Sequence, residues 1–164
     1  MEGTKITLQE MMDCREQRVK QQKELLEKYS LPMLSFCMNI PGPVKTTEDI
    51  RKAFELGKKE IFSVLEEKGI PLYEKIEVHK TTGDELLLVF DASASEVKTW
   101  MMNIEEKHPL GRLFDIDILD EEGKKISRHG FRKCLICNCQ AQECARTRRH
   151  TVEEMQKKIQ ELMK

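Results

Sequence analysis

Two aspartates spaced two residues apart lie in an otherwise apolar segment, GRLFDIDIL, at residues 111–119. We expect this segment to form a strand whose side chains alternate between two faces, with Leu113, Asp115, Asp117 and Leu119 on one face. The opposite face would then carry Arg112, Phe114, Ile116 and Ile118. Neighbouring carboxylates on one face repel each other, so the arrangement favours a cation between them. The alternative is an exposed sheet edge whose charges discourage edge-to-edge pairing.

Four cysteines and a histidine lie within seventeen residues of the segment RKCLICNCQAQECARTRRH, namely Cys134, Cys137, Cys139, Cys144 and His150. A C-x2-C pair followed by a further cysteine and a histidine supplies the soft sulfur and nitrogen ligands of structural zinc. A closed site with four protein ligands leaves no position for a reacting water, so such a zinc would be structural. Reduced thiols or a redox pair are the alternatives.

A basic segment surrounds these cysteines. Residues 124–150 hold eight Lys or Arg and one Glu, a net charge of +7, whereas the whole chain has a net charge of −1. A local basic surface of this kind suits a polyanion, such as a phosphorylated small molecule, a nucleic acid or an acidic protein. The alternative is a basic loop that only contacts solvent.

The turn NIPGPVKTT at residues 39–47 is a second candidate phosphate site. A helix N-terminus offers free N–H groups and a partial positive charge, and Lys45 would lie beside it. The segment is not a P-loop, and a turn without a ligand is the alternative. Among the histidines, His108 and His129 are candidate general bases, and His79 is expected on a strand surface. The chain has no G-x-S-x-G or G-x-G-x-x-G motif, which weakens the hydrolase and dinucleotide-binding hypotheses.

The elements that position these residues can be predicted from capping signals and apolar spacing. A capping box of Thr7 and Glu10 begins a helix over 8–29, and an apolar run predicts a strand over 33–39. Thr46 or Thr47 begins a second helix, which Gly69 and Pro71 end. Strands over 72–80 and 85–90 then form a hairpin, and a capping box of Ser93 and Glu96 begins a helix that ends at 108–109. Thr151 and Glu154 begin the last helix.

The order of elements between residues 33 and 119 is therefore β-α-β-β-α-β, which predicts an α+β fold, the ferredoxin-like sandwich. An N-terminal helix (1–30) precedes this core (31–122), and a basic Cys-rich segment ending in a helix (123–164) follows it. A length of 164 residues favours a single domain, 1–164. No apolar run approaches the ~20 residues needed to cross a bilayer, and the N-terminus lacks a signal-peptide core. We expect a cytoplasmic protein without a membrane partner, in which cysteines are thiols or metal ligands.

The segment HPLGRLFDIDIL, followed by GKKISR at 123–128 and then by RKCLIC and CARTRRH, resembles the apo-citrate lyase phosphoribosyl-dephospho-CoA transferases, also called holo-citrate-lyase synthases. The resemblance continues upstream in REQR at 15–18, in Gln22 and in LSFCMNIPGPVK, and so covers nearly the whole chain. Cys139 is an extra cysteine relative to this pattern. The resemblance therefore favours Cys134, Cys137, Cys144 and His150 as the ligands if zinc binds.

The resemblance implies a nucleotidyltransferase-type enzyme whose donor is 2'-(5''-triphosphoribosyl)-3'-dephospho-CoA. Its phosphoribosyl-dephospho-CoA part would be joined to a serine of the citrate lyase acyl carrier subunit, with release of diphosphate. The nucleophile then belongs to the partner protein, in agreement with the missing serine-nucleophile motif. Carrier subunits are usually acidic, so the basic segment is a plausible surface for both partner and donor.

Roles for individual residues follow from the same resemblance. Asp115 and Asp117 are expected to hold Mg²⁺ at the triphosphate, and His108 is the candidate general base. The bidentate geometry of guanidinium favours three arginines as phosphate ligands, Arg112, Arg128 and Arg132. Arg15 and Arg18 are candidate ligand contacts, although a solvated helix face remains the alternative for both.

A second hypothesis comes from another class of protein. A ferredoxin-like module with a basic zinc knuckle could bind RNA or regulate a partner without catalysis. The chain has only nine Phe, Trp or Tyr residues, and the expected strands lack the paired aromatics on which an RNA-binding sheet stacks bases. We therefore expect no nucleic-acid partner.

Overall fold

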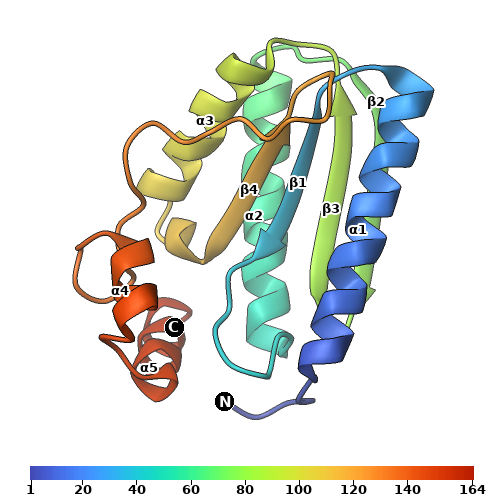
Figure 1. The fold of residues 1–164 in the computed structure, drawn as a ribbon. Helices are drawn as coiled ribbons and strands as arrows, with labels where there is room; N and C mark the ends of the chain where they lie inside the picture. Colours follow the sequence, from blue (N-terminus) through green and yellow to red (C-terminus); the bar gives the residue numbers. More distant parts are fainter.

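The computed structural model describes residues 1–164 and shows an α+β protein with a four-stranded antiparallel sheet and five helices. The strands are β1 (Met33–Met38), β2 (Leu72–Lys80), β3 (Gly83–Phe90) and β4 (Phe114–Leu119). They lie in the order β2-β3-β1-β4, and each neighbouring pair is antiparallel (Figure 1). The strand that carries the two aspartates, β4, is therefore at an edge of the sheet.

Helices cover both faces of this sheet. Figure 1 shows α2 (Glu48–Glu67) and α3 (Ala94–Lys107) on one face and α1 (Leu8–Tyr29) across the other. Two shorter helices, α4 (Ala141–Thr147) and α5 (Val152–Leu162), lie beyond the end of the sheet at which β1 ends and β4 begins (Figure 1). None of the helices combines the length and the apolar character that a membrane span requires.

The caps of the helices match most of the sequence signals. The predicted capping boxes at Thr7 and Thr151 are both present, and Thr47, not Thr46, caps α2. Ser93 accepts a hydrogen bond from the Glu96 amide, but the reciprocal bond of a capping box is missing, so the prediction for α3 is only half confirmed. Helix α4 lies within the segment in which the sequence indicated no regular element.

The main core lies between the sheet and the α2/α3 layer. Phe36 and Phe54 stack at a centroid distance of 4.9 Å, and Phe114 meets Phe36 edge to face at 5.5 Å. Gly57 in α2 permits this close approach, because a Cβ atom there would lie 2.6 Å from the Phe36 ring. A smaller cluster under α1 contains Leu25, Met33, Leu87, Val89 and Leu119. The α1 face is therefore apolar only around the start of β1 and the end of β4.

The predicted strand over 111–119 is only partly correct. Residues Gly111–Leu113 form a 3-10 turn, and β4 begins at Phe114. The turn brings Gly111 so close to the end of α3 that a Cβ atom there would lie 2.3 Å from the Glu105 carbonyl oxygen. Arg112 consequently does not share the strand face of Phe114. From Phe114 onwards the predicted alternation is confirmed, because Phe114, Ile116 and Ile118 are fully buried whereas Asp115 and Asp117 are not.

His79 is exposed on strand β2, as predicted, and it belongs to a charged network on the α2 side of the sheet. Its ring nitrogens lie 2.7 Å from the buried Asp84 and 2.8 Å from Glu77. Arg51 also binds Asp84, and Lys58 binds Glu77. The pKa of His79 is raised, chiefly by its hydrogen bond to Asp84 and further by Glu77, against the opposing effect of burial.

We expect this histidine to make the stability of the fold depend on pH. A raised folded-state pKa adds stability that is complete below the unfolded value of about 6.5 and is lost as the pH rises through the folded-state value. Urea unfolding of wild type between pH 5 and 9 should show this fall, and His79→Gln should flatten it. The exposed His129 provides the control, since His129→Gln should keep the wild-type slope. An unchanged slope in His79→Gln would contradict the assignment.

Candidate functional site

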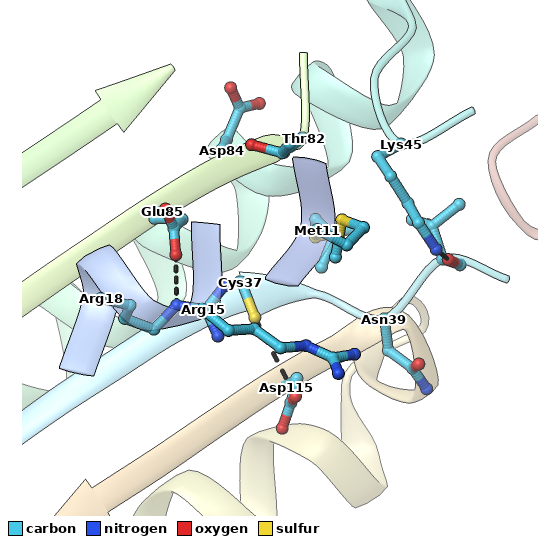
Figure 2. Close-up of a pocket in the computed structure, with 13 residues that line it drawn as sticks. Met11, Arg15, Arg18, Cys37, Asn39, Lys45, Thr82, Asp84, Glu85 and Asp115 are labelled. Carbon is cyan, nitrogen blue, oxygen red and sulfur yellow. Dashed lines mark hydrogen bonds and ion pairs between the residues drawn. The ribbon is translucent and has the colours of Figure 1, made fainter. Parts of the chain in front are cut away.

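Glu85, Cys37 and Asp115 form a polar row across three strands on the α1 face of the sheet. The row lies beyond the apolar cluster under α1. Cys37 at the end of β1 is paired in register with Glu85 on β3 and with Asp115 on β4. Arg18 of α1 forms an ion pair with Glu85, so this arginine is fixed above the row. The Cys37 thiol points to the Asp115 carboxylate, with 3.9 Å between Sγ and Oδ2 (Figure 2).

A cavity of about 190 Å³ lies between α1 and this polar row. Its lining includes Arg15, Asn39, Lys45, Thr82 and Asp115, and Figure 2 shows the Arg15 side chain extending from α1 toward Asn39 and Asp115. Arg15 is exposed and makes no ion pair, and the buried Thr82 hydroxyl has no hydrogen-bond partner. The cavity therefore combines an uncommitted cation with an unsatisfied polar group, both of which a ligand would satisfy.

Lys45 adds a second positive group to the same cavity. Its ammonium donates a hydrogen bond to the Ile40 carbonyl across the Pro-Gly-Pro turn. Burial lowers the pKa of Lys45, and the nearby charge of Arg15 lowers it further. Two cations that already repel each other favour an anion between them.

The two aspartates differ in their surroundings. Burial raises the pKa of Asp115, and the Asp117 charge raises it further, whereas Arg132, Lys125 and Arg18 act in the opposite direction. Asp117 forms an ion pair with the exposed Lys125 at 3.3 Å. Burial, and next the charge of Asp115, raise the pKa of Cys37 to about 12, so this residue stays a thiol and is no nucleophile at neutral pH. Asp115 is thus the carboxylate that would gain most from a bound cation.

The three arginines predicted to bind phosphates are engaged within the protein. Arg128 and Arg132 both pair with Glu105, whose side chain is only 3% exposed. Arg132 also donates to the carbonyls of Gly111, Arg112 and Phe114. Arg128 and Arg132 nevertheless line a second cavity, of about 450 Å³, together with Asp115 and Asp117. Asp115 thus lies on the boundary of both cavities.

Arg112 binds the Cys-rich segment. It donates to the carbonyls of Cys134 and Leu135 at 3.1 and 3.2 Å and to the Asn138 side chain at 2.6 Å. These contacts follow from the 3-10 turn, which directs Arg112 away from the strand face. Arg112 therefore holds the segment in place. It also lines a cavity beside that segment, and its role as a phosphate ligand stays a prediction.

His108 does not join the aspartates. It caps the end of α3, its Nδ1 accepts a hydrogen bond from the Leu110 amide, and its ring lies 5.1 Å from that of Phe114. The Phe114 side chain is on the core face of β4, opposite the aspartates. The predicted metal ligands of the Cys-rich segment are, in contrast, brought together. Ligand atoms of Cys134, Cys137, Cys144 and His150 all lie within 4.8 Å of one another.

Sequence reasoning missed Glu105 and Lys98, two buried charged residues of α3 that hydrogen-bond to main-chain groups at the outer edge of β4. Glu105 accepts a hydrogen bond from the Ile116 amide at 3.0 Å, and Lys98 donates to the Ile116 carbonyl at 3.2 Å. Their spacing of seven residues, directly beside the apolar stripe, is the signal that could have identified them. Cys37, Glu85 and Thr82 were also missed, because their importance depends on strand register and on the cavity beside it.

Comparisons with known proteins give one consistent result. The sequence profile of the family described as "Apo-citrate lyase phosphoribosyl-dephospho-CoA transferase" matches residues 6–164. A Vibrio cholerae serotype O1 protein named "Probable apo-citrate lyase phosphoribosyl-dephospho-CoA transferase" is 40% identical over 96% of this chain and 91% of that protein. Proteins of Citrobacter koseri and Shigella boydii, both named as apo-citrate lyase phosphoribosyl-dephospho-CoA transferases, are 32% and 30% identical over 96% of this chain and 88% of their own.

We expect Glu105→Ala to destabilise the protein by roughly 3–5 kcal/mol, because the change leaves the partly buried Arg128 and Arg132 and the buried Ile116 amide without this partner. The neighbouring Glu106 is the matched control. It pairs with Arg128 at 3.3 Å but its side chain is 58% exposed, so Glu106→Ala should change the free energy of unfolding by less than about 1 kcal/mol. Urea unfolding followed by circular dichroism measures both values. Equal effects of the two substitutions would refute a central role for Glu105.

Proposed function

The chain belongs to the apo-citrate lyase phosphoribosyl-dephospho-CoA transferase family, and we propose that it transfers phosphoribosyl-dephospho-CoA to the acyl carrier subunit of citrate lyase. The match over residues 6–164 supports a nucleotidyltransferase-type activity, whereas nothing in the comparisons supports an RNA-binding or regulatory module. We also propose that the core is a ferredoxin-like sandwich. The element order and the strand order β2-β3-β1-β4 support that assignment.

The proposed donor is 2'-(5''-triphosphoribosyl)-3'-dephospho-CoA, and the acceptor is a serine hydroxyl of the carrier. The serine oxygen forms a new bond to the phosphorus next to the ribose, and the bond from that phosphorus to the diphosphate breaks. The diphosphate leaves with the electron pair of the broken bond, and the serine proton passes to a base. This enzyme therefore has to position two substrates and offset negative charge, and it needs no nucleophile of its own.

The observation that carries this proposal is the cavity between α1 and the polar row. Its uncommitted Arg15, Lys45 and the unpartnered Thr82 hydroxyl line the same cavity as Asp115. Two cations and a hydroxyl donor match the oxygens of a triphosphate. Arg18 is already neutralised by Glu85, so we assign to it the positioning of α1 and not direct phosphate binding.

Asp115 and Asp117 would hold Mg²⁺ at the side of this cavity. Two carboxylates on one strand face are suitable oxygen ligands, and the burial and mutual repulsion that raise the pKa of Asp115 would be offset by a divalent cation. When bound, the ion would supply positive charge to the phosphate oxygens. In the structure, Lys125 places one positive charge beside these carboxylates through its ion pair with Asp117.

A larger cavity of about 660 Å³ offers room for the rest of the donor. Apolar side chains of Leu135, Val152 and Met155 line it together with the basic Arg148 and Lys133. Such a lining suits the methyl and methylene groups of a pantetheine arm and a phosphate on the adenosine. Asn39 lines both this cavity and the cavity at Arg15, so we place one extended donor molecule along the two. The basic segment 124–150 is the proposed surface for an acidic carrier.

The transfer itself is tested by intact mass spectrometry of the apo carrier subunit after incubation with this protein, the donor and Mg²⁺. Wild type should add the mass of phosphoribosyl-dephospho-CoA, and EDTA should prevent it. Asp115→Asn should lower the rate by about 100-fold or more, because it removes a carboxylate ligand of the proposed Mg²⁺, which offsets the charge of the phosphates. Asp91→Asn, at an exposed carboxylate outside the site, should keep the wild-type rate. Absence of any mass gain with a competent carrier would refute the function.

Arg15→Ala separates phosphate binding from the remaining steps. Loss of one charge-assisted hydrogen bond, worth about 1.5–3 kcal/mol, should lower kcat/KM for the donor by roughly 10- to 100-fold. The exposed Lys20 on the same helix is the control, and Lys20→Ala should leave kcat/KM for the donor unchanged. Equal losses in both variants would mean that the general charge of α1, and not a contact of Arg15, is responsible.

The base that accepts the serine proton stays a prediction. His108 was the candidate from the sequence, but its ring lies on the far side of β4 from the cavity. If this residue is the base, His108→Ala should lower kcat strongly and leave KM for the donor unchanged. Retention of the wild-type kcat would exclude it.

A further inference from the structure

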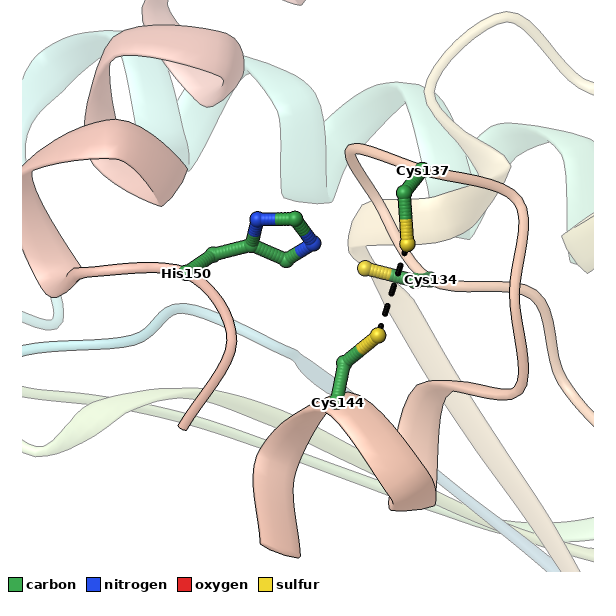
Figure 3. A group of neighbouring side chains, drawn as sticks. All are labelled: Cys134, Cys137, Cys144 and His150. Atoms are coloured by element: carbon green, nitrogen blue, oxygen red, sulfur yellow. Dashed lines mark hydrogen bonds between the residues drawn. The ribbon is translucent and has the colours of Figure 1, made fainter. Parts of the chain in front are cut away.

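Four ligand groups of the Cys-rich segment converge on one point, although they come from separate pieces of chain. Cys134 and Cys137 lie in a loop, Cys144 lies in α4, and His150 precedes α5. Figure 3 shows the imidazole of His150 directed toward the three sulfur atoms. We propose that these four residues bind one structural Zn²⁺. This inference does not rest on the proposed transfer reaction, because it concerns a separate cluster of side chains.

The spacing of the four groups fits a tetrahedral zinc. Zn–S and Zn–N bonds of about 2.0–2.3 Å place tetrahedral ligands about 3.3–3.8 Å apart. The sulfur atoms of Cys137 and Cys144 lie 3.4 Å apart, and all four ligand atoms lie within 4.8 Å of one another. All six cysteines of the chain are free thiols, so no disulfide accounts for this proximity.

His150 provides an independent indication. Its Nε2 atom is buried and has no hydrogen-bond partner, an arrangement that costs free energy unless a ligand satisfies the nitrogen. Its Nδ1 atom lies 3.7 Å from the Glu154 carboxylate. This distance is longer than a hydrogen bond, but a carboxylate beside the second nitrogen is the usual outer contact of a zinc-bound histidine and favours the tautomer that leaves Nε2 free to bind metal.

The surroundings of the sulfur atoms also suit thiolates. Three thiolates and one Zn²⁺ carry a net charge of −1, and Arg149 lies beside the cluster, 3.9 Å from the Cys137 sulfur. The Ile136 amide donates to the Cys134 sulfur at 3.4 Å. On binding, the cysteines coordinate as thiolates and their protons pass to solvent, so the step involves no redox change.

Cys139 is excluded from the ligand set although it lies two residues from Cys137. Its side chain is exposed, it is outside the group of converging ligand atoms, and its sulfur lies 3.3 Å from Arg149. It is therefore a matched control within the same loop.

The metal would fix the wall of the largest cavity described above. Cys134, Cys144 and His150 all line that cavity. Helix α4 has only seven residues, too few to be stable without tertiary contacts. Zinc would tie this helix and the start of α5 to the loop that Arg112 holds against the sheet.

The experiment measures zinc in the full-length protein, purified under reducing conditions and dialysed, by inductively coupled plasma mass spectrometry. Wild type and Cys139→Ser should each retain one zinc per chain, and Cys137→Ser should lose most of it. The metal-free protein reconstituted with Co²⁺ should show the intense visible absorption of tetrahedral cobalt with thiolate ligands. The proposal would be overturned if wild type retained no zinc and its cobalt form lacked this absorption. Equal losses of zinc in Cys137→Ser and Cys139→Ser would overturn it as well.

A milder pair of variants covers the case in which Cys137→Ser fails to fold. Glu154→Gln leaves all four ligands in place and should weaken zinc retention by about 10- to 100-fold in competition with a chromophoric chelator. The adjacent exposed Glu153 provides the control, since Glu153→Gln should match wild type. Equal retention by wild type and both variants would contradict the role of Glu154 in the site.

Discussion

The structure around the candidate site depends on one buried carboxylate, that of Glu105. Burial raises the pKa of this group, whereas Arg132, the Ile116 amide, Arg128 and Lys98 favour its charged form. A charge in such a position is tolerated only with several partners, and those partners come from α3, from β4 and from the basic segment after it. One side chain thereby fixes the helix, the strand with the aspartates and the start of the Cys-rich segment relative to one another.

The two faces of the sheet have different roles. On the α2/α3 face, stacked and edge-to-face phenylalanines fill the space so closely that Gly57 is required. On the α1 face, apolar packing ends at the middle of the sheet, and Glu85, Cys37 and Asp115 follow. A row of polar side chains beneath a helix contributes little to stability, but it creates a cavity in which the charge of a ligand can be matched.

Much of this arrangement could be predicted from the sequence where local rules decide the outcome. The bounds of α1 and the capping residues Thr7 and Thr151 depend on neighbouring residues, and the alternation from Phe114 to Leu119 depends on strand geometry alone. The convergence of three cysteines and His150 was also expected, but ligand types alone left four cysteines open, and the family resemblance set Cys139 aside. The 3-10 turn at 111–113 was not predictable, since it results from the close approach of Gly111 to the end of α3. The partners of Arg112, Arg128 and Arg132 could not be inferred either. A guanidinium that suits a phosphate also suits a carboxylate or a backbone carbonyl.

The covered edge of β4 has a consequence for recognition. The amide and carbonyl of Ile116 are bound by Glu105 and Lys98, and the Ile118 carbonyl accepts a hydrogen bond from the Ile126 amide. A protein that approaches Asp115 and Asp117 therefore finds three main-chain groups of this edge already bound, which hinders the addition of a strand. Selection among related carrier proteins at this place must then rely on side-chain charge and shape, which can change by single substitutions while the backbone stays the same.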